Sequence, residues 1–532
     1  GVTVKLGDGG AVELASTVDA PLIVDVTAAY VPVGEPTSAG RYVPVVPFRA
    51  LDTRETGQRG VGDIDVPIPS GVPADATAIA VNVSIVESAA AGFLTVHANG
   101  TERPVAATAT VDGPGQTRSV GAVVPVSPNG LTLYRSMRAD VVVDVTGWFT
   151  GESAEPGTDG LFVPVDQVRM WDTRTATALT GGGGLERQLV DESVREQVVA
   201  VVANIASDAA FGAGWIAAGP AGVPTDEVVA SVNPDGAAAT SNMAIVPVSD
   251  RGAVFTSLST TDVIVDVYGW YTGTPYTATA PVPLNPVPAP PRTLMVSDSV
   301  FASLRWEQTL DVLRGTEYVT DLQSCRRLIG ASCRGREGFA PSNALDAVAA
   351  ADGMFDVVVI AVGYNDPAST FSTSFEQVVT VARDKGARRI IWVTYREDTN
   401  YRSPFGWTSS DVFASHNATL RAHLASGNYP DVVLADWWDY TGEHPEWFPD
   451  GIHHSEVASV AAADWLSRWV AHVSRRPCPV WETGARVCAH PDERGLPTDV
   501  WSLYRDGDEV QSSAWISSET DGRASGVGGS DR

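Results

Sequence analysis

The sequence predicts a multidomain protein in which all-β repeat domains, sandwich-like in architecture, precede an α/β domain with three layers and a parallel sheet. Two observations lead to this prediction. In the first half of the chain, similar segments recur at a spacing of 120 to 122 residues. In the second half, strand-like and helix-like segments alternate. The length of 532 residues also exceeds what one hydrophobic core serves.

The composition excludes some classes of partner. The net charge is −28, which argues against binding to nucleic acid, whose phosphates require clustered Lys and Arg. It argues equally against adhesion to anionic lipid. No apolar run approaches the roughly 20 residues that a membrane-spanning helix needs. No signal peptide is visible, and we expect any export signal to have been removed before Gly1.

Two full repeats cover residues 42–151 and 161–273. Both are rich in Val, Thr, Ala and Gly in short alternating runs, which predicts strands with one buried face. Residues 1–33 match only the last third of a repeat, with Asp25 in the place of Asp144. We therefore expect a partial third repeat here, and a natural protein that continues upstream.

The motif Arg-x-x-Asp-Thr-Arg occurs once in each full repeat, and an aspartate of a Val-Asp-Val run follows it. The motif could bind a ligand or serve the structure. We favour a structural role, because a charge repeated within alternating strands is usually buried and paired. The predicted pairs are Asp144 with Arg49 or Arg54, and Asp266 with Arg169 or Arg174. The repeats resemble those found in tandem on secreted actinobacterial surface proteins, often beside a hydrolase.

Residues 274–293 are rich in Pro and Ala, which predicts an extended, semi-rigid linker. The α/β domain follows over residues 294–474. A C-terminal extension covers residues 475–532, and its polar end is expected to be disordered.

The α/β domain is expected to contain five strands and five helices in alternation, which implies a parallel sheet covered on both faces. In such sheets, sites form at the carboxyl edge. The expected strands are 293–298, 317–322, 355–363, 388–395 and 431–438; the expected helices are 300–313, 342–352, 374–386, 411–426 and 456–474.

Residues suited to acyl transfer follow these strands. Ser299 follows the first strand, Asn365 follows the third, and Asp450 and His453 precede the last helix. A serine hydroxyl needs a base to become a nucleophile, and His453 can be that base. Asp450 can orient the imidazole. The Asn365 amide and the Ser299 N–H can bind an oxyanion.

Each of these residues has a plainer interpretation when it is taken alone. Ser299 is a good helix N-cap, and we expect it to be both cap and nucleophile. Asn365 with Asp366 could form a turn, and so could Asp450 with Gly451. Their order, their spacing and their places at strand ends favour the catalytic interpretation.

These motifs resemble those of the SGNH, or GDSL-like, hydrolase family over about residues 293–474. The resemblance implies an ester hydrolase with Ser299, Asp450 and His453 as catalytic triad, and with no metal or cofactor. The family's first glycine is here Ser297, so that the motif reads Ser-Asp-Ser. The family's oxyanion glycine is also missing after the second strand. Ser324 is its best match there, and Gly338 is the alternative.

Four cysteines form two close pairs, Cys325 with Cys333 and Cys478 with Cys488. Neither pair has the neighbours of a zinc site. Two local disulfides are favoured over four reduced cysteines, and they indicate a secreted or cell-surface protein. A bond between Cys325 and Cys333 would brace the loop that carries Ser324.

Among the remaining histidines, His454 is the second choice for the base. His454 would point away from Ser299 if its loop is extended, while His444 and His416 are expected at the surface. Five aromatic residues lie near the Asp-His loop and could stack on sugar rings or pack beneath the last helix, and the sequence favours neither. They are Trp437, Trp438, Tyr440, Trp447 and Phe448.

The resemblance therefore implies a serine esterase. For an exported protein, we expect it to remove O-acetyl or short acyl groups from an extracellular or cell-surface glycan, with a lipid ester as the second choice of substrate. The β-repeats would carry the enzyme and could join it to a cell-wall or surface assembly. The alternative is a surface binding or structural protein, or a fibre subunit, in which the hydrolase-like domain is vestigial or only binds glycan.

Overall fold

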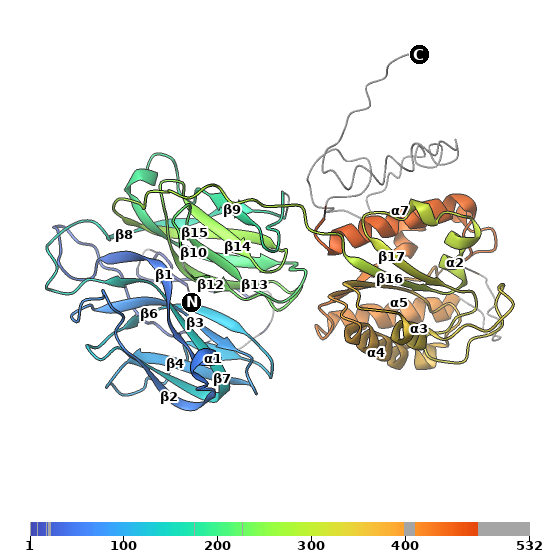
Figure 1. Ribbon diagram of the computed structural model, residues 1–532, viewed down its shortest axis with the longest axis horizontal. Coiled ribbons are helices and arrows are strands. Elements are labelled where there is room, and N and C mark those ends of the chain that lie inside the picture. The colour runs from blue at the N-terminus through green and yellow to red at the C-terminus, as the bar shows by residue number, and fades with distance from the viewer. Residues whose placement is uncertain are drawn as a thin grey trace, which may run out of the picture. The chain divides into compact units, whose positions relative to one another are not determined.

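The structure is a computed structural model that divides the chain into two compact units, each considered by itself below (Figure 1). The first unit holds the β-repeats and extends to Pro286, and the second begins at Val287. The structure describes residues 2–7, 9–16, 19, 23–174, 176–225, 227–397, 399 and 410–476. The predicted Cys478–Cys488 bond and nearly all of the C-terminal extension lie outside these residues.

The first repeat is organised by the long strand β7. The carboxyl-terminal half of β7 pairs with β1 and β3, and its amino-terminal half pairs with β2 and β4, all antiparallel. One strand thus serves both halves of the repeat. The elements are β1 (Tyr42–Asp52), α1 (Thr53–Thr56), β2 (Gly60–Val66), β3 (Ala78–Val86), β4 (Gly92–Ala98), β5 (Ala109–Val111), β6 (Arg118–Pro125) and β7 (Leu131–Phe149).

The second repeat has two four-stranded antiparallel sheets, in the orders β13-β10-β15-β8 and β12-β11-β14-β9. Its strands β8, β10 and β13 begin 120, 120 and 122 residues after β1, β3 and β6. The elements are β8 (Phe162–Asp172), β9 (Gly184–Arg187), the 3-10 turn η1 (Arg195–Gln197), β10 (Val198–Asp208), β11 (Ile216–Pro220), β12 (Ala230–Val232), β13 (Thr240–Pro247), β14 (Ala253–Ser257) and β15 (Asp262–Thr272).

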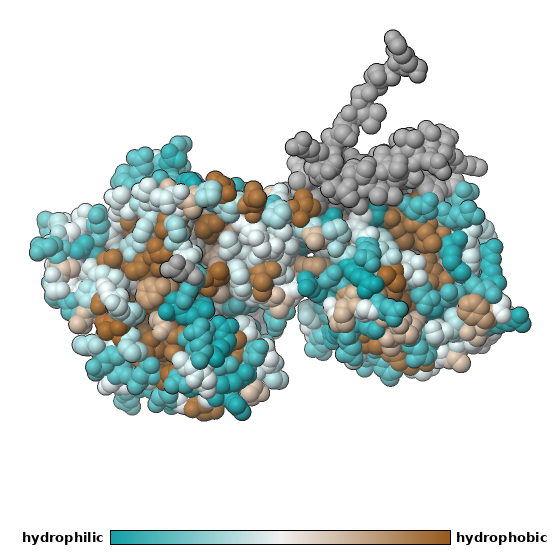
Figure 2. All heavy atoms as spheres, viewed as in Figure 1, coloured by the Kyte–Doolittle hydropathy of each residue, from teal (hydrophilic) through white to brown (hydrophobic). Residues whose placement is uncertain are grey.

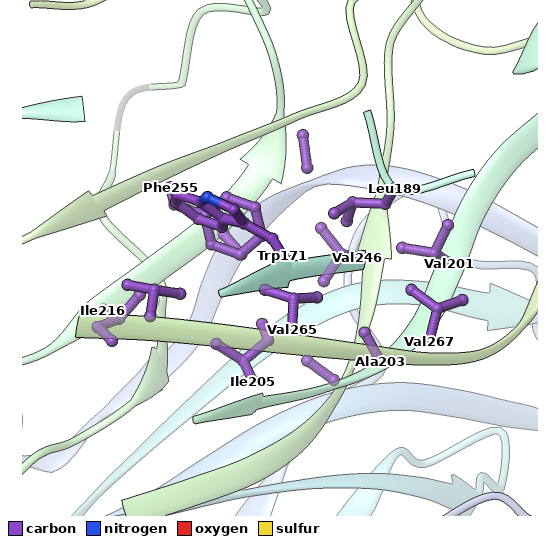
Figure 3. Packing of buried hydrophobic residues seen from close by; sticks show 14 of the residues in the cluster. Trp171, Leu189, Val201, Ala203, Ile205, Ile216, Val246, Phe255, Val265 and Val267 are labelled. Carbon is purple, nitrogen blue, oxygen red and sulfur yellow. The ribbon is translucent and has the colours of Figure 1, made fainter. Parts of the chain in front are cut away.

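Both sheets of the second repeat contribute to one hydrophobic core. The ring of Trp171 on β8 lies beside that of Phe255 on β14, with their centroids 5.0 Å apart (Figure 3). Alternate residues of β10 and β15, such as Ile205 and Val265, point into the same cluster (Figure 3). This packing is what the two-residue periodicity of the sequence predicts.

The predicted Arg–Asp pairs are confirmed, and they use the first arginine of each motif. Arg49 Nε lies 3.0 Å from Asp144 Oδ1, and Arg169 Nε lies 2.9 Å from Asp266 Oδ1. The second arginine of each motif pairs instead with the motif's own aspartate: Arg54 with Asp52, and Arg174 with Asp172. The Arg49–Asp144 and Arg169–Asp266 pairs link neighbouring strands, as the structural interpretation requires.

An aromatic centre joins the two repeats and the N-terminal segment. Tyr42 of the first repeat stacks on Tyr271 of the second at 4.5 Å. Phe162, which stands in the second repeat where Tyr42 stands in the first, stacks in the same way on Tyr30 at 4.3 Å. The Tyr30 and Tyr271 hydroxyls share a hydrogen bond. Tyr30 thus stacks on the second repeat as Tyr271 stacks on the first.

The strand expected in the partial repeat is not formed: residues 23–33 contain no strand. In the full repeats the matching strand lies between two neighbouring strands, and residues 1–33 include the counterparts of neither. Side chains whose counterparts are buried therefore stay at the surface: Ile23 is 89% exposed, whereas Val142 is 3% exposed. Apolar residues reach the surface of the repeat unit in Figure 2 as well.

The Pro-rich linker is not a free spacer along its whole length. Asn285 accepts a hydrogen bond from the Thr180 N–H at 2.8 Å and donates one to the Ala178 carbonyl at 2.9 Å. The Gly184 N–H also donates to the Leu284 carbonyl. These bonds hold the linker, up to Pro286, against the second repeat.

The α/β domain has a five-stranded parallel sheet in the order β17-β16-β18-β19-β20. Helices α2 and α7 cover one face, and α3, α4 and α5 cover the other (Figure 1). All ten predicted elements are present. The elements are β16 (Arg292–Ser297), α2 (Ser299–Trp306), η2 (Leu310–Val312), β17 (Glu317–Leu322), α3 (Ala344–Ala350), β18 (Val357–Ala361), α4 (Ala368–Asp384), β19 (Arg389–Val393), α5 (Ser410–Ala425), β20 (Val432–Ala435), α6 (Trp437–Thr441), η3 (Pro445–Trp447) and α7 (Glu456–Val473).

Within the described residues, no helix combines the length and the apolar character that crossing a membrane requires.

The two Arg–Asp pairs differ in burial, and this difference predicts different costs of removing them. The side chains of Arg49 and Asp144 are 21% and 1% exposed, whereas those of Arg169 and Asp266 are 49% and 9% exposed. We expect Arg49→Ala to reduce the free energy of unfolding by about 3 kcal/mol, because it leaves a buried carboxylate without a cation. Arg169→Ala should cost clearly less, because its guanidinium is half exposed and solvent screens the pair. Denaturant unfolding measures both, and equal costs would contradict this account.

Candidate active site

The central strand β16 places the nucleophile candidate. It ends at Ser297, and α2 begins at Ser299. The prediction that Ser299 caps this helix is wrong: Asp298 is the cap, and its carboxylate accepts from the Val300 N–H at 3.1 Å. Ser299 is the first helical residue, where its own N–H has no partner within the helix. Its hydroxyl and N–H therefore both remain available to a substrate.

Ser299, His453 and Asp450 form a hydrogen-bonded row. His453 Nε2 lies 2.9 Å from Ser299 Oγ, and His453 Nδ1 lies 2.5 Å from Asp450 Oδ2. Asp450 Oδ1 also accepts from the His453 N–H at 2.8 Å, which fixes the loop. Burial raises the pKa of Asp450, but the hydrogen bonds from His453 outweigh it and lower this pKa to about 2. Asp450 therefore stays ionised beside the imidazole.

This row has the geometry that activates a serine. An imidazole within hydrogen-bond reach of the hydroxyl can take its proton, and a carboxylate on the other ring nitrogen stabilises the imidazolium that results. Ser299 is 8% exposed, and the side chains of His453 and Asp450 are 28% and 51% exposed, so all three reach the surface.

Asp298 ties the nucleophile to the segment that follows β18. Its buried carboxylate accepts from the Gly363 and Tyr364 N–H groups, both at 3.0 Å. Position 363 requires glycine, since φ is +149° and a Cβ there would lie 2.2 Å from the Tyr395 hydroxyl. These bonds hold Asn365 at the same edge of the sheet as Ser299.

Neither predicted match for the missing oxyanion glycine has a free N–H. The Ser324 N–H donates to Glu337 Oε2 at 3.3 Å, and the Ser324 hydroxyl bonds to the same carboxylate. The Gly338 N–H donates to the Gly335 carbonyl at 3.0 Å. We therefore withdraw Ser324 as an oxyanion donor. A carboxylate directly against it would also repel an anion.

Arg326, two residues beyond Ser324, is the better candidate, and the sequence motif did not indicate it. Its carbonyl accepts from Asn365 Nδ2 at 3.2 Å, so its backbone adjoins Asn365. Among the described residues, none accepts a hydrogen bond from its N–H. Cys325 before it has a left-handed φ of 61°, which turns the chain at this point. The bond between Cys325 and Cys333 is present and braces this loop.

Ser297, in the place of the family's first glycine, does not reach Ser299. It is fully buried, and its hydroxyl donates to the Asp298 carbonyl at 3.0 Å. The additional side chain is thus accommodated below the site.

The other histidines lie outside this row. His454 is buried, and its Nδ1 lies 2.8 Å from Ser303 Oγ, so it points away from Ser299 as predicted. Burial lowers its pKa to about 3. His444 stacks on Trp447 at the surface. The prediction for His416 is wrong: it is fully buried and stacks on Phe371 at 4.0 Å.

Of the five aromatic residues near the Asp-His loop, three are buried and two are half-buried. Trp437 is fully buried against Trp465 of α7, with centroids 4.9 Å apart, so it packs beneath the last helix. Tyr440 and Phe448 are buried as well. Trp438 and Trp447 are only half-buried: the Arg396 guanidinium lies over the Trp438 ring, 5.1 Å from its centroid, and His444 stacks on Trp447.

The chain matches no described protein family and no curated protein. Among solved structures, it is similar to a carbohydrate acetylesterase family member from Sinorhizobium meliloti, at 13% identity over 34% of this chain and 99% of the other, with a TM-score of 0.28. It is also similar to a family two carbohydrate esterase from Clostridium thermocellum, at 11% identity over 58% and 98%, with a TM-score of 0.24. These scores are too low to support an argument about this chain.

Two buried carboxyls beneath the site predict a dependence of stability on pH. Burial raises the pKa of Asp366 to about 7, although the Leu328 N–H and Arg327 oppose the shift, and burial raises that of Asp298 to about 6. A carboxyl with a raised folded-state pKa stabilises the fold fully below its unfolded pKa of 3.8, and this contribution is lost as pH rises through the folded value.

We therefore expect the α/β domain to lose stability between about pH 4 and about pH 7, that is, from the unfolded pKa to the folded values, and Asp366→Asn to lose less. Calorimetric scans of both proteins across this range measure the difference. A variant whose unfolding temperature falls as steeply as that of the unmodified chain would contradict the assignment.

Proposed function

We propose that this chain is a serine esterase of the SGNH type that removes O-acetyl or short acyl groups from an extracellular or cell-surface glycan. The observation that supports this proposal most is the unbroken row Asp450–His453–Ser299, with its two hydrogen bonds of 2.5 and 2.9 Å. The row lies at the carboxyl edge of a parallel sheet, where α/β proteins bind ligands. In this proposal the protein is secreted and the β-repeats carry the enzyme.

In the proposed reaction, Ser299 Oγ attacks the acyl carbonyl while His453 Nε2 takes its proton. The oxyanion forms beside three donors: the Ser299 N–H, the Arg326 N–H and the Asn365 amide. Asn365 Nδ2 has two protons and gives one to the Arg326 carbonyl, so the second can serve the oxyanion. The bond from the acyl carbon to the sugar oxygen then breaks, and the protonated His453 gives its proton to that oxygen, so the sugar leaves as a free hydroxyl. Water releases the acyl group from Ser299 by the same steps in reverse order.

The leaving group is proposed to be a sugar because the rim carries half-buried aromatic rings. Trp438 and Trp447 flank the segment that leads to Asp450 and His453. Aromatic faces of this kind present apolar surface to a sugar ring, and tryptophan adds a polar N–H.

Hydrolysis of p-nitrophenyl acetate and of acetylated xylan tests the proposal. Ser299→Ala should lower kcat by at least about 10³-fold, because the nucleophile is lost while the oxyanion donors remain. Ser303→Ala is the matched control: Ser303 lies on the same helix and also contacts a histidine, His454. Its activity should stay within a few-fold of the unmodified enzyme.

Equal activity of the Ser299→Ala and Ser303→Ala variants would contradict the proposal. A folded, unmodified chain that hydrolyses neither ester would instead favour a role in glycan binding.

A further inference from the structure

The loop between β17 and α3 concentrates positive charge in an acidic protein. The chain has 36 Lys and Arg against 64 Asp and Glu. Residues 325–339 nevertheless contain four arginines and only one acidic residue. This basic loop begins directly after the carboxyl edge of β17, next to the strand that leads to Ser299.

Two of these arginines are already neutralised, and two are not. Arg326 pairs with Asp321 at 2.8 Å, and Arg327 lies 3.6 Å from Asp366. Arg334 and Arg336 are exposed. Among the described residues, neither has a carboxylate within ion-pair distance. Glu337, the one acidic residue of the loop, pairs with Arg305 and Ser324 instead.

The loop holds these two guanidinium groups in defined places. The Arg336 N–H donates to Ser324 Oγ at 2.6 Å, and its guanidinium lies over the Trp306 ring, 4.5 Å from the centroid. Arg334 Nε donates to the Gly338 carbonyl at 2.8 Å. The Cys325–Cys333 bond closes the loop at its base. A ligand therefore meets cations whose side chains are already ordered, which reduces the entropic cost of binding.

The same loop carries an exposed aromatic ring. Phe339 is 52% exposed, and its carbonyl accepts from the Gly335 N–H at 2.9 Å, so it belongs to the same braced loop. The two unpaired guanidinium groups and the exposed ring therefore belong to one loop next to the carboxyl edge of the sheet.

We infer that Arg334, Arg336 and Phe339 form a subsite for an acidic sugar, so that the ester substrate is an acylated anionic glycan. A planar guanidinium matches a carboxylate or phosphate, and the phenyl ring offers an apolar face to the pyranose. This inference rests on the proposed function in one respect, namely that the bound glycan also carries the ester.

Binding to the inactive Ser299→Ala chain tests the subsite without requiring catalysis. Calorimetric titration compares tetragalacturonate with the neutral galactotetraose. We expect tighter binding of the anionic saccharide, and about a tenfold loss when Arg334→Gln and Arg336→Gln are combined. Arg388→Gln is the matched control, since Arg388 is exposed but lies at the amino edge of the sheet, just before β19.

Equal affinity for the two saccharides, or an unchanged affinity in the double variant with an intact circular dichroism spectrum, would overturn the subsite. The outcome is separable from the esterase proposal. Arginine-dependent binding by Ser299→Ala, together with a lack of ester hydrolysis by the unmodified chain, would preserve the subsite and refute the enzyme.

Discussion

The candidate site depends on one buried carboxylate, that of Asp298. It accepts hydrogen bonds from the Val300, Gly363 and Tyr364 N–H groups, and so joins the start of α2 to the segment that follows β18. A carboxylate buried this deeply is costly unless several donors surround it. The need to satisfy it therefore fixes the distance between the Ser299 helix and the Asn365 segment, before any substrate arrives. Asp366 is a second buried carboxylate of this kind. Both of its oxygens accept from the Leu328 N–H, which joins the segment after β18 to the loop that follows β17.

Ion pairs between strands impose comparable constraints on the β-repeats. Arg49 with Asp144, and Arg169 with Asp266, join neighbouring strands at the same place in each repeat. The aromatic centre adds a second repeated contact, in which Tyr42 meets Tyr271 as Phe162 meets Tyr30. The motif Arg-x-x-Asp-Thr-Arg thus needs no ligand to account for it.

The sequence predicted those features whose determinants lie within a few residues of each other. Ser299, Asn365 and His453 each follow or precede one regular element, and a parallel sheet brings such positions to one edge. The prediction of a β-strand in residues 23–33 was wrong because a strand needs neighbouring strands to pair with, and residues 1–33 include the counterparts of neither. His416 was predicted at the surface but is buried. Its spacing from Phe413 and Leu420, which puts it on the apolar face of α5, could have indicated this. The prediction of Ser324 as an oxyanion donor was wrong because its hydrogen-bond partner is Glu337, thirteen residues away, and because the left-handed backbone conformation of Cys325 turns the chain next to it.

The central claim is that the Asp450–His453 pair makes Ser299 nucleophilic. The most direct measurement is reaction of the full chain with a fluorophosphonate, followed by peptide mass spectrometry that locates the phosphonylated residue. The account predicts one adduct per chain, on Ser299, and no adduct in His453→Ala. An adduct on another serine, or a folded chain that stays unlabelled, would contradict it.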